Sequence, residues 1–348
     1  MQTLDERKAA ILKTIVRDYV RDGEPVGSKR IASESDLGVS AATVRSEMAA
    51  LEDAGFIAQP HTSAGRVPTD KGYRFFVDTL GATTPLSEEQ KTAIERLLVG
   101  SADLEELLRR TSTVLSRLTR FAALVVPPPL DRSRLRHIEL VRLSSHTVLA
   151  VLIADTGRVD KRLLDLDTTI ADHEVQRARH AVNEAAAGLQ LAAAPDVIAG
   201  VAAGAPEELV PLIEAIGDAI RGGLATPAGS DQLFLGGTAN IAAAGYFDRL
   251  EQVKQVYETL EEQVVVLRML QDAIAGGDPG VRIGAELPLV ELAACSVVAA
   301  SYEAARGTAG TLGVLGPSRM DYPRTLAAVQ AVASSLEKAL GELVGDDA

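Results

Sequence analysis

The stretch from Ser40 to Gly55 carries the residues whose types and spacing best suit recognition of another molecule. Ser40 is placed to cap the start of a helix, and Gly55 is placed to take a left-handed conformation after its last turn. Val44, Met48 and Leu51 fall at i, i+4 and i+7, so they share the face that packs on a core. The opposite face and its flanks present the candidate contact residues, which are Ser40, Ala42, Thr43, Arg45 and Ser46.

Small side chains let a helix enter the major groove of DNA, where an arginine can donate two hydrogen bonds to the acceptors of guanine. A solvated helix whose alanines merely favour helicity gives the same local pattern. The flanking sequence favours DNA, because Ser28 to Gly38 predicts a short helix and a glycine turn directly ahead. The two helices form a helix-turn-helix, and Ser28 and Lys29 at the start of the first one are further candidate contacts.

A hairpin and a last helix follow this pair. Phe56 to Pro60 predicts a strand, His61 to Arg66 predicts a tip, and the chain returns through Val67. Hydroxyl groups and an arginine at such a tip suit phosphates or the minor groove. Thr69 is placed to cap the last helix. The first 80 residues therefore predict a winged helix-turn-helix, whose further candidate contacts are His61, Thr62, Ser63, Arg66, Lys71 and Arg74.

These strings also resemble a known family. Residues 28 to 78, above all His61 to Asp78, resemble the heat-inducible transcription repressor family HrcA. Two later strings agree with it, Leu233 to Ile241 and Gly313 to Tyr322, so the resemblance covers nearly the whole chain. The chain departs from the family at Leu287, where an asparagine is expected.

Beyond a polar linker, strands occur on both sides of a helical block. Alternating apolar runs between 121 and 166 predict strands, the alanine-rich stretch from 170 to 224 predicts helices, and strands resume from 281 to 315. This order predicts one sheet domain interrupted by an insertion.

The expected fold class is α+β. The resemblance implies a GAF-like antiparallel sheet domain with helices, interrupted by an inserted helix-rich dimerisation domain. The expected boundaries are 1–80 for the winged helix, 81–86 for the linker, 87–168 and 265–348 for the GAF-like domain, and 169–264 for the insertion.

The formal net charge of -13 argues against DNA binding, because DNA-binding domains usually carry excess Lys and Arg. The first 80 residues, however, hold 11 Lys and Arg against 12 Asp and Glu, whereas the remainder holds 24 against 36. Since the acidity lies mostly outside the candidate domain, DNA binding through few phosphate contacts is expected.

The residues predict no catalysis, no cofactor and no metal site. Gly236 to Asn240 lacks the lysine of a phosphate-binding loop and predicts a turn. The five histidines are scattered, whereas a zinc site needs three or four converging ligands. Cys295 lies in an apolar run, which predicts an inert buried thiol. Arg319, Asp321 and Tyr322 are expected to cap the final helix rather than to bind a ligand.

The resemblance implies a homodimeric repressor of chaperone and chaperonin genes that binds an inverted-repeat operator in double-stranded DNA. It also implies dependence on a GroEL-type chaperonin, with release from DNA on heat stress when denatured proteins occupy that chaperonin. Two alternatives stay open. One is a ligand-gated regulator whose GAF-like sheet holds a small molecule, and the other is an enzyme fused to a DNA-binding head.

The single cysteine excludes an intramolecular disulfide, and no apolar run approaches the roughly 20 residues of a spanning helix. The sequence also lacks a basic segment ahead of an apolar leader. A cytoplasmic protein without membrane contact is expected, associated with the nucleoid when it is bound to DNA.

Overall fold

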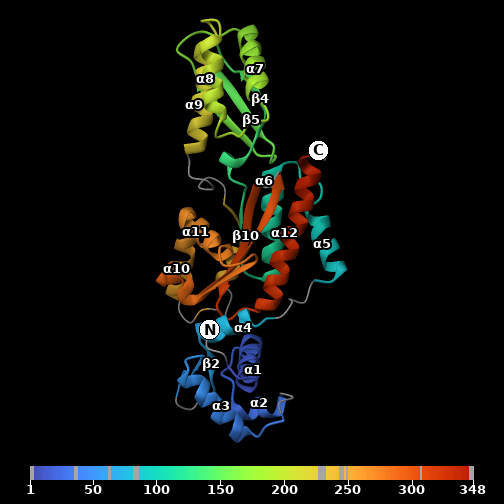
Figure 1. Ribbon diagram of the computed structural model, residues 1–348, viewed down its shortest axis with the longest axis vertical. Helices are drawn as coiled ribbons and strands as arrows, with labels where there is room; N and C mark the ends of the chain where they lie inside the picture. Colours follow the sequence, from blue (N-terminus) through green and yellow to red (C-terminus); the bar gives the residue numbers. More distant parts are fainter. Residues whose placement is uncertain are drawn as a thin grey trace.

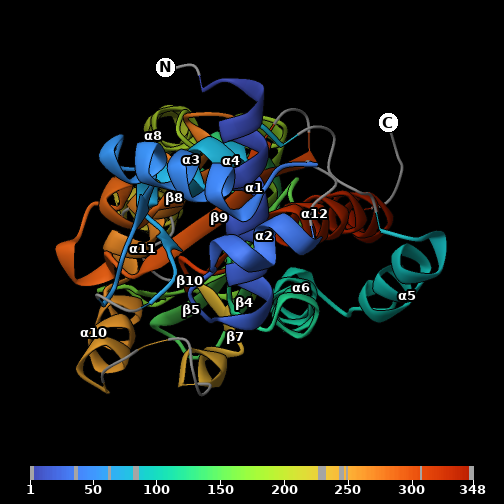
Figure 2. The same cartoon turned by 90° about the horizontal axis from the view of Figure 1, so that it is seen from below.

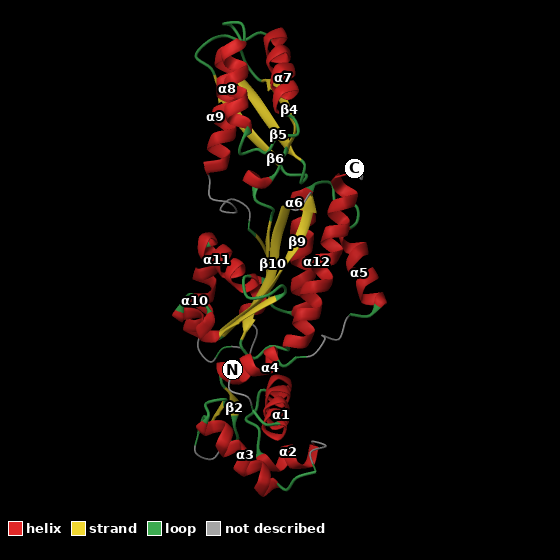
Figure 3. Cartoon of the chain, in the orientation of Figure 1, coloured by secondary structure: helices red, strands yellow, loops and turns green. Residues whose placement is uncertain are grey.

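The computed structural model describes residues 4–34, 38–61, 64–80, 86–225, 233–242, 247, 250–305 and 308–344. This part of the chain is elongated and consists of three units stacked along its long axis (Figure 1). We call them the N-terminal unit (residues 4–80), the five-stranded unit and the three-stranded unit, the last two defined by their sheets below. Helices and antiparallel sheets occur together, so the α+β class is confirmed (Figure 3).

The N-terminal unit lies at one end of the molecule. Its helices begin at the expected caps: the Ser40 hydroxyl accepts from the Thr43 amide at 3.2 Å, and the Thr69 hydroxyl accepts from the Gly72 amide at 3.2 Å. Gly55 takes a φ of 76° after the third helix, as expected for a residue that ends a helix. The elements are α1 (Glu6–Asp22), α2 (Ser28–Glu34), α3 (Ala41–Asp53), β1 (Ile57–Ala58), β2 (Val67–Pro68) and α4 (Asp70–Asp78).

The five-stranded unit is an antiparallel sheet of order β7-β3-β10-β9-β8. The side chains of Ala123 and Val125 pack towards α6 and α12, while Ala122 and Leu124 pack towards α10 and α11, so both faces are covered. Helix α5 packs outside α6 and α12 (Figure 1). The elements are β3 (Ala122–Val126), β7 (Phe234–Gly236), β8 (Gly280–Ile283), β9 (Cys295–Ala305), β10 (Thr308–Pro317), α5 (Glu88–Leu98), α6 (Leu104–Thr119), α10 (Leu250–Glu261), α11 (Gln263–Ile274) and α12 (Tyr322–Val344).

The three-stranded unit has a core of its own at the opposite end of the molecule. Its helices cover one face of a meander, where Val148, Ala150 and Leu152 are buried. The elements are β4 (Leu135–Arg142), β5 (Thr147–Ala154), β6 (Val159–Asp165), α7 (Asp172–Ala186), α8 (Ala194–Gly204) and α9 (Val210–Ala225).

The unit boundaries differ from those expected from the sequence. Strands β4 to β6 are expected in the first GAF-like segment, 87–168, but they form a separate sheet whose core is shared with α7 to α9. Helix α10 is expected in the insertion, 169–264, but its Val256 and Leu260 pack in the core of the five-stranded unit. The insertion therefore starts after β3 and ends before β7. Helices α10 and α11 meet at Glu262.

Candidate nucleic-acid interface

Helix α3 lies at the outer end of the N-terminal unit, beside α2 (Figures 1 and 2). Its inner face packs on the core through Val44, Met48 and Leu51, as the spacing predicts. The outer face is small-sided apart from one arginine, and its exposed residues are Ala42, Arg45, Ser46, Ala49 and Asp53. Thr43 is half-buried on the flank.

Arg45 is the exposed cation at the flank of this face. Within the described residues it has no hydrogen bond and no ion pair, so its five donors are available to a ligand. Lys29 on α2 is exposed as well, and Ser28 is half-buried at the start of that helix. The Ser40 hydroxyl lies at the amino end of α3, where it caps the first turn.

A short hairpin stands next to α3. Strands β1 and β2 pair antiparallel, and the backbone of Arg66 exchanges two hydrogen bonds of 2.9 Å with that of Val26 in an isolated bridge. Gly65 lies so close to the Val26 backbone that a side chain would not fit there. At the tip His61 is exposed, and the Gln59 side chain donates to the Ala64 carbonyl at 3.1 Å. Two expected contacts at the tip, Thr62 and Ser63, lie outside the described residues.

Two basic residues near the hairpin are engaged by the protein itself. The Arg66 guanidinium lies against Glu52 at the end of α3, with Nε at 2.9 Å and NH2 at 2.7 Å from Oε2. The Lys71 ammonium donates to the Ala54 carbonyl at 2.8 Å and lies 4.4 Å from the centre of the Phe56 ring. Such contacts neutralise or immobilise charge that would otherwise be offered to phosphates.

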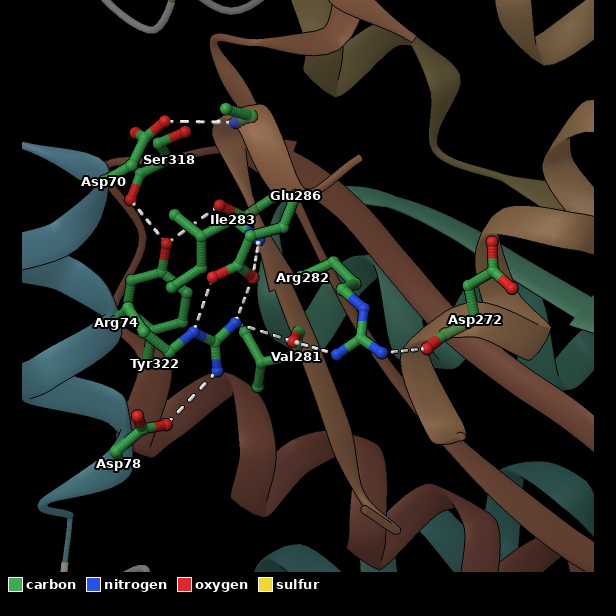
Figure 4. Close-up of polar contacts among 12 residues, drawn as sticks. Asp70, Arg74, Asp78, Asp272, Val281, Arg282, Ile283, Glu286, Ser318 and Tyr322 are labelled. Atoms are coloured by element: carbon green, nitrogen blue, oxygen red, sulfur yellow. Dashed lines mark hydrogen bonds and ion pairs between the residues drawn. The ribbon is translucent and has the colours of Figure 1, made fainter. Parts of the chain in front are cut away.

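Arg74, which was also expected to contact DNA, lies elsewhere. Its side chain points towards Glu286 and Val281, in the junction with the five-stranded unit (Figure 4). There Nε donates to Glu286 Oε1 at 2.8 Å, NH2 donates to Glu286 Oε2 and to the Val281 carbonyl, the latter at 2.8 Å, and NH1 lies 3.3 Å from Asp78. Partial burial lowers the pKa of Arg74, but the hydrogen bonds and charges of Glu286 and Asp78 outweigh it and raise the pKa overall.

The rest of this junction is also specific (Figure 4). The Ala285 amide donates to Asp70 at 3.1 Å, and the adjacent Gly284 has no room for a side chain because Asp70 lies against it. The rings of Tyr73 and Tyr322 pack 5.9 Å apart. Tyr322 is buried, and its hydroxyl donates to the Ser318 carbonyl at 2.8 Å and bonds Ser296 at 2.8 Å.

Arg319, Asp321 and Tyr322, at the start of α12, were all expected to cap this helix, but they have different roles. Asp321 caps the helix, because its side chain accepts from the Arg324 amide at 3.2 Å. Tyr322 belongs to the buried junction described above. Arg319 reaches α1, where its guanidinium lies 5.8 Å from the Tyr19 ring and against Gly23. The expected cap is therefore provided by one of the three residues.

Sequence reasoning did not single out Glu52, Val26 or Glu286, which position the candidate residues. No local signal pairs Glu286 with Arg74, because 212 positions separate them. Val26 also lies outside any regular spacing. Glu52 alone could have been noticed, as a carboxylate on the last turn of the candidate helix.

The remaining candidate chemistry is structural. Gly236 ends β7, and its neighbour Gly237 turns the chain so that Asn240 donates to Ser116 at 3.0 Å. Cys295 is buried, and burial raises the pKa of its thiol to about 12. The cavity beside Cys295 measures about 10 Å³, enough for one water molecule at most. Within the described ranges, no three His, Cys, Asp or Glu side chains are grouped to hold a metal ion.

Comparisons with known proteins extend this picture. The sequence pattern of the HrcA protein C-terminal domain matches residues 105–326. The chain is 43% identical to the heat-inducible transcription repressor HrcA of Frankia casuarinae, over 99% of this chain and 100% of that protein. It is 46% identical to that of Thermobifida fusca, over 95% of each.

The chain belongs to the HrcA family.

HrcA proteins are heat-inducible transcription repressors, so the chain is a transcription regulator and not an enzyme. This confirms the family expected from the sequence and removes the enzyme alternative. The crystal structure of a hypothetical protein has a similar fold, with a TM-score of 0.64 and 22% identity over 98% of this chain and 100% of that one. Among the helices in the described ranges, none is long and apolar enough to cross a membrane.

Proposed function

We propose that this HrcA-family chain represses chaperone genes by binding, as a homodimer, to an inverted-repeat operator. The N-terminal unit would be the winged helix, with α3 in the major groove and the hairpin as the wing. The observation that carries the proposal is the outer face of α3, where an arginine without a protein partner stands among small side chains. The contacts that we propose are Ser28, Lys29, Ser40, Ala42, Thr43, Arg45, Ser46 and the hairpin tip from His61 to Ser63.

A dimer is supported by the outer face of the three-stranded sheet, which the helices of that unit leave uncovered. In the central row Leu149 lies between Val141 and Leu163, and in another row Ile153 lies next to Val159. Val141 and Leu163 are 44% and 64% exposed, although both are large and apolar. Such a face is typical of an interface, so we assign it to a second copy of the chain.

The two proposed interfaces lie at opposite ends of the elongated chain (Figure 1). In a two-fold dimer joined through the three-stranded units, the five-stranded units would set the distance between the two α3 helices. That distance must match the spacing of the two operator half-sites. We take the five-stranded unit to be the GAF-like domain of the family.

Regulation by a GroEL-type chaperonin is part of the same proposal. Its support is membership in a heat-inducible repressor family. The chaperonin would help the chain reach its folded form, and the amount of active repressor would fall when heat-denatured proteins occupy the chaperonin. The chain would act in the bacterial cytoplasm, at the nucleoid while it is bound to DNA.

The test is a salt-titrated binding assay on a palindromic operator from a chaperone promoter and on a scrambled duplex. Operator-selective binding is expected, with a larger active fraction in the presence of chaperonin. Arg45→Ala should lower operator affinity by about 10- to 100-fold, since a well-placed arginine contact to guanine contributes about 1–3 kcal/mol.

Arg268→Ala is the matched control, because Arg268 is an exposed arginine on α11, far from α3. It should bind the operator as tightly as the unaltered chain. Equal binding to both duplexes, unchanged by Arg45→Ala, would refute the proposed function.

A further inference from the structure

We infer that Glu52 is a specificity-determining residue, which withholds the charge of Arg66 from DNA and so suppresses binding to non-operator sequences. The inference rests on the proposed function, because it assigns a role within the same DNA-binding face. It concerns discrimination between sequences, which the base contacts of Arg45 alone do not determine.

The geometry ties the two side chains together. Both Nε and NH2 of Arg66 lie within hydrogen-bonding distance of one carboxylate oxygen of Glu52, at 2.9 and 2.7 Å. The two backbone hydrogen bonds between Arg66 and Val26 hold the base of the hairpin at the same time. The side chains are 21% and 32% exposed, so both partners of the pair are partly shielded from solvent. Arg66 is therefore fixed at both its backbone and its guanidinium.

The position of this pair gives it an electrostatic consequence. Arg66 directly precedes β2, the return strand of the proposed wing, where an unpaired guanidinium would be offered to the phosphate backbone. A phosphate contact adds affinity for every DNA sequence equally and steepens the dependence of binding on salt. Because Glu52 accepts hydrogen bonds from the Arg66 guanidinium, Arg66 does not contact the phosphate backbone.

The neighbouring cations are engaged in a similar way. Lys71 is held by the Ala54 carbonyl, and Arg74 is held by Glu286. Lys29 on α2 and Arg45 on α3 remain exposed. The protein would then bind DNA of any sequence weakly while its base contacts remain selective. Glu52 contributes to this by pairing with Arg66, the cation of the wing.

The experiment measures affinity and salt dependence on operator and scrambled duplexes for the full-length chain and four variants. Glu52→Gln keeps the shape of the side chain but removes its charge. It should raise affinity for scrambled DNA about three- to tenfold and steepen the slope of log K against log salt by about 0.9, the value of one phosphate contact. The ratio of operator to scrambled affinity should fall by a similar factor.

Glu89→Gln is the matched control, because Glu89 is an exposed carboxylate on α5, outside the N-terminal unit, and forms no ion pair within the described residues. It changes net charge equally and should leave the slope unchanged. The double variant Glu52→Gln with Arg66→Gln should return the slope to that of the unaltered chain. Arg66→Gln alone should change neither slope nor operator affinity, and this prediction does not depend on how Glu52→Gln folds.

An equal effect of Glu89→Gln and Glu52→Gln would overturn the inference, since net charge would then explain both. A shallower slope for Arg66→Gln alone would also overturn it, because Arg66 would already be contacting phosphate. These outcomes differ from failure of the proposed function, in which the unaltered chain would show no operator preference at all.

Discussion

The guanidinium of Arg74 on α4 is clasped by the carboxylate of Glu286, and the same guanidinium donates to the Val281 carbonyl at 2.8 Å. One arginine thus joins the N-terminal unit to the turn that follows β8. Together with the Tyr73–Tyr322 ring contact and the Asp70–Ala285 hydrogen bond, this arginine fixes the position of the N-terminal unit on the five-stranded unit.

We expect the Arg74–Glu286 pair to couple the stability of the two units. In a double-mutant cycle of Arg74→Ala and Glu286→Ala, the interaction free energy should be about 1 kcal/mol, at the upper end for partly exposed ion pairs. The measurement is urea unfolding of the three variants and the unaltered chain. Strict additivity of the two single changes would show that the pair contributes nothing.

A charge on the outer face of the three-stranded sheet should break the proposed dimer. Leu163→Glu places a carboxylate in the apolar row beside Leu149, and its burial without a partner should raise the dimer Kd on the order of 100-fold. Sedimentation equilibrium gives the Kd. Gln176→Glu, an equal charge change at an exposed position of α7, should leave it unchanged. A dimer that persists in Leu163→Glu would place the interface elsewhere.

The N-terminal unit should lose stability in acid through Asp22. Hydrogen bonds from Arg21 and then from Arg30 lower the pKa of Asp22 in the folded chain. A lowered pKa in the folded state means that the stabilising contribution is complete above the ordinary value and is lost as pH falls below about 4.

The check is a series of unfolding curves across that pH range. In Asp22→Asn the stability should fall less steeply with decreasing pH, because this variant lacks one of the carboxylates that must be protonated. An unchanged pH profile in this variant would assign the acid sensitivity to other groups.

The thiol of Cys295 should be unreactive in the folded chain. Burial raises its pKa to about 12, so little thiolate forms at neutral pH, and the surrounding core blocks access. Labelling with a disulfide reagent should therefore follow the opening of the five-stranded unit. A reaction rate that is independent of denaturant and close to that of a free thiol would contradict the buried position.

The sequence predicts local structure correctly where a single residue type determines it. Ser40 and Thr69 begin their helices as expected. The face of α3 was also accessible, since burial of Val44 and Met48 follows from spacing alone. These are interactions between residues three or four positions apart.

The sequence did not predict which strands pair with one another. In β5 the inward Val148 and Leu152 alternate with the outward Leu149 and Val151, so both faces are apolar and the pattern cannot say which one is covered. Alternation also identifies a strand without identifying its sheet. For this reason β4 to β6 were assigned to the wrong unit. The engagement of Arg66 and Arg74 was equally hidden, because both depend on tertiary packing.

The connectivity of the five-stranded sheet has a consequence for synthesis. Strand β3, which is entirely apolar, pairs with β7 and β10, and both follow the three-stranded unit in the chain. At about 5–20 residues per second, β3 leaves the ribosome on the order of ten to forty seconds before β10. The three-stranded unit can fold before β7 is made, while β3 still lacks both of its partner strands. Chaperones bind exposed apolar surface, so the proposed need for a chaperonin would follow from the order in which the strands are made.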